Sequence, residues 1–160
     1  MELSKYILEP VRKDEEFVLY RGYQVSHTDP PSVLVLAPVT TRPALESLKK
    51  IEHEYSLRDE LDSAWAVRPL AVCEHRGQPV LVLEDPGGET LDRLLPGPME
   101  MGQFLRFAVG LAAALSRLHK RDLIHKDIKP TNVLVNSVSG QVWLAGFGIA
   151  CSGRLLRKRR

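Results

Sequence analysis

The sequence predicts an α+β chain with two parts: short strands with one helix, followed by a part built around a longer helix. Three observations predict this. Short apolar runs bounded by turn-forming residues lie within residues 6–36 and 67–83. A helical spacing of apolar residues separates them, and a longer helical pattern spans residues 101–120. The length of 160 residues, 44% of them hydrophobic, allows one domain with a real core or two small lobes.

The first part contains five predicted strands and one helix. YILEPV (6–11) and FVLY (17–20) read as strands on either side of the charged segment RKDEE, and HTDPPS (27–32) reads as a turn. VLVL (33–36) is a candidate buried strand, and residues 42–61 form the predicted helix. Two further strands, 67–73 and 79–83, flank the turn EHRGQ and predict a hairpin.

The second part begins with turn-forming residues. EDPGGE reads as a linker between lobes, and TLDRLL as a short helix. The helix at 101–120 is the clearest in the chain, with a broad apolar face of Phe104, Leu105, Ala108, Leu111, Ala112, Leu115 and Leu118. The polar loop HKDIKPTNVLVN follows, and residues 133–135 and 142–144 predict a hairpin across NSVSGQ.

Composition limits the classes of function. Lys and Arg total 22 against 20 Asp and Glu, a net charge of +2, which does not indicate a nucleic-acid-binding or membrane-binding chain. Cys73 and Cys151 fit no metal spacing and read as free thiols in a reducing compartment. We find no signal peptide and no apolar run near the ~20 residues of a membrane span. We therefore expect a cytoplasmic chain, with a basic tail, RLLRKRR, that is either a frayed terminus or a contact for acidic surfaces.

The loop after the long helix carries residue types that suit phosphoryl transfer. Asp127 can accept a proton from an acceptor hydroxyl, Lys129 can lie against a transferred phosphoryl group, and Asn132 offers an oxygen to Mg²⁺. Pro130 stiffens the segment between them. The alternative is a polar surface loop whose charges are only solvated.

HKDIKPTNVLV is similar to the catalytic loop of the protein kinase superfamily, where the residue before Asp127 is usually Arg. LHKRDLIH resembles the end of the long helix that precedes this loop. LVLED followed by GGETL resembles the hinge, with Leu83 as gatekeeper and Glu84, Asp85 and Pro86 as hinge residues whose backbone could hold an adenine. The resemblance covers residues 6–150, and its first part looks most like the kinase-like module that opens large bacterial multidomain signalling proteins.

This resemblance implies a small antiparallel-sheet N-lobe with one helix (1–84) and a partial, mainly helical C-lobe (85–150) truncated after the Phe-Gly segment. Residues 151–160 would form a basic tail. Glu54 in EHEYSL fits the glutamate of helix C, and LAGFGIA matches the Asp-Phe-Gly segment except at Gly146. The helix at 101–120 would then lack part of its cover, which would leave an exposed apolar patch.

Several departures from the kinase pattern concern the groups that hold ATP and Mg²⁺. Gly146 stands where an aspartate is expected, so Asn132 would be the only side-chain metal ligand of the usual pair. Aligning VLVLAP to strand three places Leu34 at the lysine position. Lys49 or Lys50 could substitute as the partner of Glu54, and the alternative is that Lys50 and Glu54 form an exposed helix pair. The glycine-rich loop is replaced by VRKDEEFVLY, with Arg12, Asp14 and Phe17 at the glycine positions, which reads as a charged turn.

Two functional hypotheses follow. The first is a catalytically impaired pseudokinase that acts by binding a protein partner or by regulating a parent multidomain signalling protein, with ATP and Mg²⁺ binding weakened or lost. The second is an active ATP-dependent Ser/Thr protein kinase with unusual ATP anchoring that uses Asp127 as catalytic base. A gene fragment without a stable role overlaps the first hypothesis.

Overall fold

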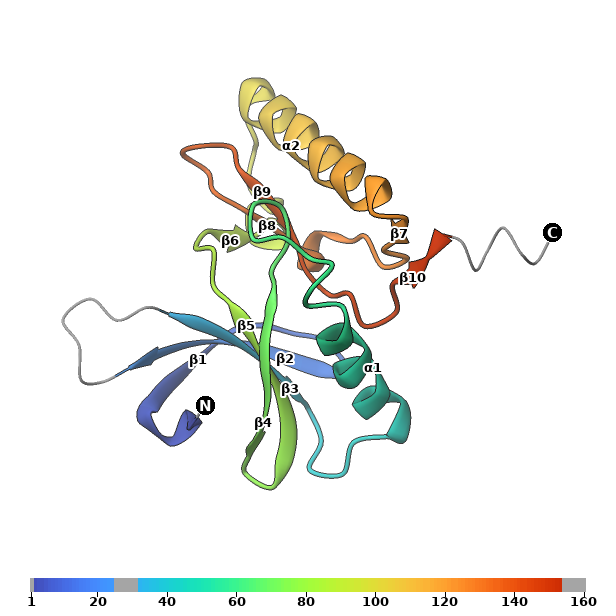
Figure 1. Ribbon diagram of the computed structural model, residues 1–160. Coiled ribbons are helices and arrows are strands. Elements are labelled where there is room, and N and C mark those ends of the chain that lie inside the picture. Colours follow the sequence, from blue (N-terminus) through green and yellow to red (C-terminus); the bar gives the residue numbers. More distant parts are fainter. Residues whose placement is uncertain (1, 25–31, 154–160) are drawn as a thin grey trace.

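The computed structural model describes residues 2–24 and 32–153, and its N-lobe is a five-stranded antiparallel sheet with one helix (Figure 1). The sheet order is β1-β2-β3-β5-β4. The strands are β1 (Tyr6–Lys13), β2 (Phe17–Gln24), β3 (Val33–Pro38), β4 (Pro69–His75) and β5 (Gln78–Glu84). Helix α1 (Leu45–Ser56) contacts β4 and β5. A 3-10 helix, Leu3–Lys5, precedes β1.

The C-lobe is built from one long helix and short strands. Helix α2 (Met101–Lys120) packs against β9 (Val142–Leu144), which pairs with β8 (Val133–Val135) and through it with β6 (Glu89–Thr90). A second small sheet joins β7 (Leu123–Ile124) to β10 (Cys151–Ser152). Two 3-10 helices, Leu91–Arg93 and Pro130–Asn132, complete the lobe.

One hydrophobic cluster belongs to both lobes. It joins Leu34, Leu81 and Leu83 of the N-lobe sheet to Leu134, Trp143 and Ala145 of the C-lobe. The indole of Trp143 also donates a hydrogen bond to the Ser63 carbonyl, at 3.0 Å. Burying apolar area contributes about 25 cal/mol per Å², so this shared cluster holds the β8–β9 hairpin against the N-lobe sheet.

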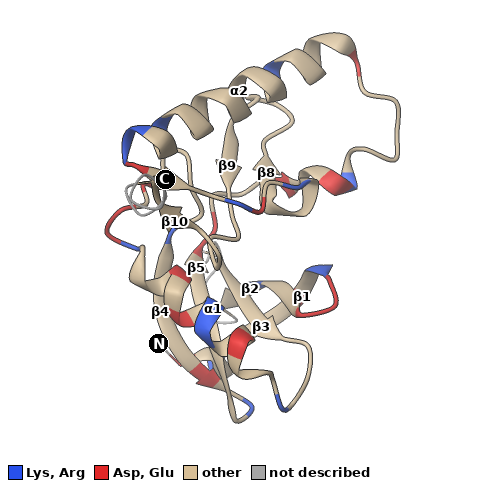
Figure 2. Cartoon of the chain, turned by 90° about the vertical axis from the view of Figure 1, so that its right-hand side faces the viewer, with Lys and Arg blue, Asp and Glu red and all other residues tan. Residues whose placement is uncertain are grey.

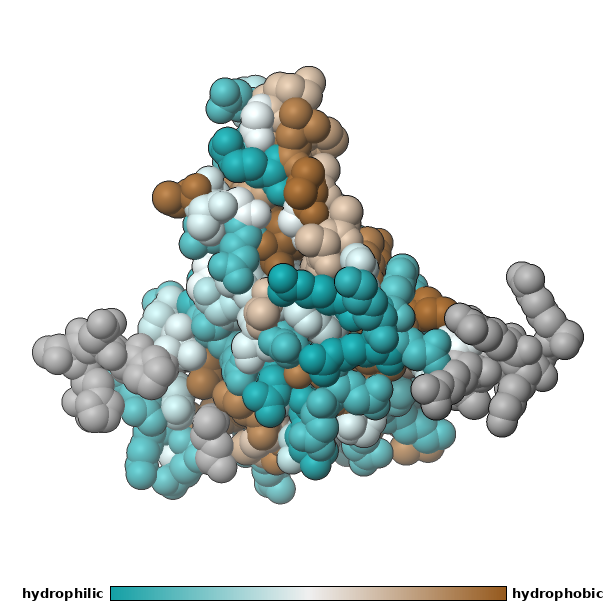
Figure 3. Space-filling view, turned by 45° about the horizontal axis from the view of Figure 1, so that its top comes forward, coloured by the Kyte–Doolittle hydropathy of each residue, from teal (hydrophilic) through white to brown (hydrophobic). Residues whose placement is uncertain are grey.

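One side of α2 is apolar and exposed, as the sequence predicts. Figure 3 shows hydrophobic residues gathered along the projecting part of the molecule that α2 forms. The side chains are large, and their exposed fractions are 53–69% for Met101, Phe104, Leu105 and Val109. The opposite side of the helix buries Phe107, Ala114 and Leu118 in the C-lobe core. No helix among the described residues is both long and apolar enough to cross a membrane.

The α+β kinase-like architecture and the bounds of α2 are confirmed, with corrections at smaller elements. The first helix begins at Leu45 rather than residue 42, because Pro43 and Ala44 precede it in extended backbone. TLDRLL forms only a 3-10 turn. Cys151 and Ser152, which the sequence places in the tail, pair with β7. His27 and the basic residues 154–160 lie outside the described residues.

Candidate active site

A buried histidine, His125, holds the catalytic loop in place through two hydrogen bonds. His125 Nε2 lies 2.9 Å from the Ala145 carbonyl oxygen, and Nδ1 accepts a hydrogen bond from the backbone N–H of Asp127 at 3.2 Å. Its ring lies 4.6 Å from that of Phe147, centroid to centroid. Burial lowers the pKa of His125, against opposing effects of the Ala145 hydrogen bond and the Asp127 charge. The neutral imidazole donates with one nitrogen and accepts with the other, which suits both contacts.

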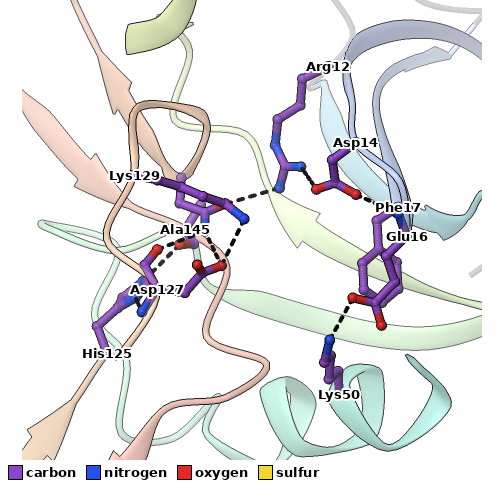
Figure 4. A network of polar contacts seen from close by, with 10 residues as sticks. Arg12, Asp14, Glu16, Phe17, Lys50, His125, Asp127, Lys129 and Ala145 are labelled. Atoms are coloured by element: carbon purple, nitrogen blue, oxygen red, sulfur yellow. Dashed lines mark hydrogen bonds and ion pairs between the residues drawn. The ribbon is translucent and has the colours of Figure 1, made fainter. Parts of the chain in front are cut away.

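The structure brings the three predicted loop residues together. Lys129 Nζ lies 3.1 Å from Asp127 Oδ2. Asn132 Nδ2 donates to the backbone oxygen of Asp127 at 2.9 Å and to its Oδ2 at 2.8 Å (Figure 4). The preceding residue, Lys126, has a φ of 70°, a left-handed conformation that is strained for a residue with a side chain. The loop therefore holds its carboxylate between an ammonium and an amide.

Gly146 cannot be replaced by a metal-binding side chain without rearrangement. Its φ is 77°, and a Cβ added there would lie 2.7 Å from Cγ, Nδ2 and Oδ1 of Asn132. The Asn132 amide therefore fills the space beside the glycine. Its Oδ1 already accepts a hydrogen bond from Arg12. With no carboxylate at position 146 and the Asn132 oxygen already bonded to Arg12, the usual pair of Mg²⁺ ligands does not fit a metal ion here.

Arg12, near the end of β1, reaches across to the catalytic loop, a contact that the sequence analysis did not predict. Arg12 Nη2 donates to Asn132 Oδ1 at 3.2 Å, and Nη1 lies 3.0 Å from Asp14 Oδ2. The Arg12 side chain is only 8% exposed. Its Nε has no partner among the described residues, and an unpaired buried donor costs about 1–3 kcal/mol. The one signal in the sequence was an arginine at a glycine position of the kinase pattern. Local spacing could not predict its partner, because the two residues are 120 positions apart.

Asp14 closes the turn on itself. Its Oδ1 accepts hydrogen bonds from the backbone N–H groups of Glu16 and Phe17, at 2.9 and 2.7 Å. Burial would raise the pKa of Asp14, but these two hydrogen bonds and the Arg12 charge outweigh it and lower the pKa. The charged turn that the sequence predicts is therefore confirmed, and its amides are turned toward its own carboxylate.

Lys50 does not replace the strand-three lysine, nor does it form an exposed pair with Glu54. Its Nζ lies 2.5 Å from Glu16 Oε2, and Ser47 donates to the other Glu16 oxygen. Glu54 is 2% exposed and forms no ion pair with a described residue. Burial raises the pKa of Glu54 to about 7, although amides of Phe147 and Gly146 and the charge of Arg12 act in the opposite direction.

The β3 side chain that lines the cavity together with Glu54 is Leu36, so the structure favours Leu36 rather than Leu34 at the strand-three lysine position. Leu36 and Glu54 line the same cavity, and Leu34 lies two residues earlier in the interlobe cluster. In the kinase pattern V-A-I-K the residue two before the lysine is alanine. A leucine there is larger, and the surrounding side chains are tightly buried, with exposed fractions of 0–2% for Leu19, Leu34, Leu83 and Leu134.

The hinge residues are also committed to protein contacts. Asp85 forms a two-pronged ion pair with Arg21, at 2.6 and 3.0 Å. The Glu84 carboxylate accepts a hydrogen bond from the Ser63 hydroxyl. The backbone N–H of Glu84 donates to the Arg68 carbonyl at 2.9 Å. Pro86 has no N–H, so it cannot supply the backbone donor that an adenine site at residues 84–86 would use.

The cavity between the lobes is small, and its charged side chains other than Glu54 are paired. It has a volume of about 230 Å³, below the roughly 300–1,000 Å³ of typical small-molecule sites. Figure 2 shows basic and acidic residues side by side at the β1–β2 turn and along α1. The cavity contains none of the hinge residues Leu83, Glu84, Asp85 or Pro86. An adenine-binding hinge and a phosphate site are therefore not continuous here.

Comparisons with known proteins agree with this architecture. The protein kinase domain matches residues 23–157. Serine/threonine-protein kinase pkn2 of Myxococcus xanthus is 33% identical over 147 residues, 90% of this chain and 18% of that protein. Mitogen-activated protein kinase kinase 7 of Arabidopsis thaliana is 29% identical over 140 residues, 83% of this chain and 45% of that protein.

A relative with a further named domain is RasGEF domain-containing serine/threonine-protein kinase X of Dictyostelium discoideum. It is 30% identical over 117 residues, 72% of this chain and 12% of that protein. The chain therefore spans between 12% and 45% of the length of these three relatives. With the family match over most of its length and the lobes and catalytic loop described above, the chain belongs to the protein kinase family.

Proposed function

We propose that this kinase-like domain is a catalytically impaired pseudokinase that acts by binding in a signalling protein. One observation carries the proposal: the groups that would meet a metal-bound phosphate already bind one another. Arg12 occupies the amide oxygen of Asn132, and Asp14 occupies the turn amides. ATP would lose its phosphate contacts, its metal ligands and its hinge donor together.

The alternative is an active Ser/Thr protein kinase with Asp127 as base, Lys129 beside the phosphoryl group and Asn132 on the metal. The geometry of the catalytic loop favours it, because the three side chains lie within hydrogen-bonding reach of one another. Losing one preorganised charge contact typically costs about 10²–10³ in rate. The chain lacks both the strand-three lysine, replaced by Leu36, and the aspartate, replaced by Gly146.

Thermal unfolding with and without ATP and Mg²⁺ tests the two hypotheses. A ligand that binds the folded state raises the unfolding midpoint by mass action. We expect no shift of the wild-type midpoint, and no phosphate transfer to a generic protein substrate above that of Asp127→Asn. A Mg²⁺-dependent shift together with transfer that Asp127→Asn abolishes would establish the active kinase instead.

We propose that the binding surface is the exposed apolar side of α2 and that its occupant is an amphipathic helix of a protein partner. The last turn of α2 carries Arg117, His119 and Lys120, at the opposite end of the helix from the exposed apolar residues. This charge favours a partner helix with carboxylates at one end. The test measures binding of a designed amphipathic peptide that carries carboxylates at one end. The double variant Leu105→Gln and Val109→Gln should abolish this binding, whereas the control Ser139→Gln on the exposed β8–β9 turn should not. Equal binding by both variants would exclude this surface.

A further inference from the structure

We propose that the Arg12–Asp14 ion pair is an internal latch that takes the place of a metal-bound phosphate and joins the two lobes without nucleotide. This inference rests on the proposed function and concerns the regulation of the same site. In it, a carboxylate takes the role of the phosphate and a guanidinium takes the role of the metal ion. Figure 4 shows Arg12, near the end of β1, between Asp14 of the β1–β2 turn and the side chains of the catalytic loop.

The anionic half of the latch is the Asp14 carboxylate. Successive backbone N–H groups in a tight turn form a small concave site that attracts anions. In this turn both available donors, the N–H groups of Glu16 and Phe17, point at Asp14 Oδ1, at 2.9 and 2.7 Å. The second oxygen of the same carboxylate lies 3.0 Å from Arg12. The turn therefore carries its own bound anion.

The cationic half is Arg12, which holds one acceptor in each lobe. Its Nη1 contacts Asp14 and its Nη2 donates to Asn132 Oδ1, the oxygen that the kinase pattern reserves for a metal ion. A planar guanidinium can serve two acceptors in fixed directions, which an ammonium on a flexible stem cannot do as well. Because the side chain is 8% exposed, water competes little for these contacts.

The remaining charges of the cavity leave no cation for a ligand. Lys50 pairs with Glu16 and Lys129 pairs with Asp127, at 2.5 and 3.1 Å. The fourth carboxylate, Glu54, is buried without an ion pair among described residues. An incoming phosphate would meet four carboxylates and three cations, and all three cations already have a carboxylate partner. The latch therefore both closes the lobes and excludes anions.

A double-mutant cycle on the full chain tests the link between the lobes without any nucleotide. The variants are Arg12→Gln, Asn132→Ala and the two combined, with Lys13→Gln as control, because Lys13 is the exposed neighbour on the same strand. We expect Arg12→Gln to lower the unfolding midpoint of the wild-type chain. In the Asn132→Ala background the same substitution should lower the midpoint by about 2–6 °C less. Arg12→Lys should recover only part of the loss. Additive effects of Arg12→Gln and Asn132→Ala would overturn the latch.

A second experiment asks whether the turn is an occupied anion site. Asp14→Gly removes the internal carboxylate and leaves Arg12 Nη1 and the N–H groups of residues 16 and 17 without their acceptor. Inorganic tripolyphosphate without Mg²⁺ should raise the midpoint of Asp14→Gly by several degrees and leave wild type and the control Glu15→Gly unchanged. The proposal fails if Asp14→Gly shows no shift, or if wild type shifts equally. Stabilisation of wild type by ATP and Mg²⁺ would instead overturn the proposed function, so the two failures are distinguishable.

Discussion

The catalytic loop and the β1–β2 turn face each other across one cavity, and they differ in how much of the kinase pattern they retain. The loop keeps Asp127, Lys129 and Asn132 with their mutual contacts. The turn has lost its glycines, and the strand-three position holds Leu36 in place of lysine. The residues that are retained stabilise the fold, and the residues that are replaced would only contact a nucleotide.

The retained loop has a structural reason to persist. His125 and Asn132 are 2% exposed; His125 bonds to the Ala145 carbonyl, and Asn132 bonds to the Asp127 carbonyl within the loop. Buried polar groups must keep their hydrogen bonds, because an unpaired one costs about 1–3 kcal/mol. The glycine loop and the strand-three lysine have no such role, so their replacement by Arg12, Asp14 and Leu36 is compatible with the fold. An intact catalytic loop is therefore weak evidence of catalysis in this chain.

The largest expected loss of stability on the catalytic-loop side of the cavity is that of Phe147→Ala. Phe147 is fully buried, lies in the C-lobe core and contacts the His125 ring. Removing a buried phenylalanine typically costs about 3–5 kcal/mol through lost burial and the cavity left behind. Urea unfolding should show this loss, whereas Val138→Ala at a 92% exposed position should change stability by less than about 0.5 kcal/mol. Similar losses for both variants would contradict the structural role of the loop.

A sharper comparison comes from restoring the family's aspartate with Gly146→Asp. The left-handed φ of 77° and the approach of 2.7 Å to the Asn132 amide both oppose a side chain. We expect a loss of about 2–4 kcal/mol in the free energy of unfolding, and no Mg²⁺-dependent shift with ATP. The matched control is Gly97→Asp, since Gly97 has open space around it and no left-handed φ. A stable Gly146→Asp chain that binds ATP with Mg²⁺ would show that one substitution separates this chain from an enzyme.

The smallest expected effect concerns Glu54, the helix-C carboxylate that has lost its lysine. Its pKa rises from an ordinary 4.5 to about 7 in the folded chain. The folded state therefore binds a proton that the unfolded state has lost between about pH 4.5 and 7, so this group destabilises the fold as the pH rises through that window. Glu54→Gln should gain stability relative to wild type from pH 5 to pH 8, on the order of 2 kcal/mol. The exposed neighbour Glu52→Gln should show no such gain, and a flat Glu54→Gln difference would refute the buried, unpaired carboxylate.

Local pattern predicted much of this protein. The bounds of α2 follow from its 3.6-residue periodicity, and the β8–β9 hairpin from two short apolar runs around a turn. Asp127, Lys129 and Asn132 lie within six residues of one another, so a stiff loop brings them together wherever it packs. Gly146 likewise could be identified as a missing ligand from its place before Phe147.

The sequence by itself therefore determined the two-part α+β organisation and the contents of the catalytic loop, because both depend on short-range spacing and apolar periodicity. The kinase fold followed from the resemblance of that loop to the family. Only the tertiary structure decided the side-chain contacts on the N-lobe side of the cavity. It places Leu36 beside Glu54, pairs Lys50 with Glu16 and brings Arg12 to Asn132. Those pairings join positions up to 120 residues apart. They depend on how the sheet, α1 and the loop pack, which no local spacing records.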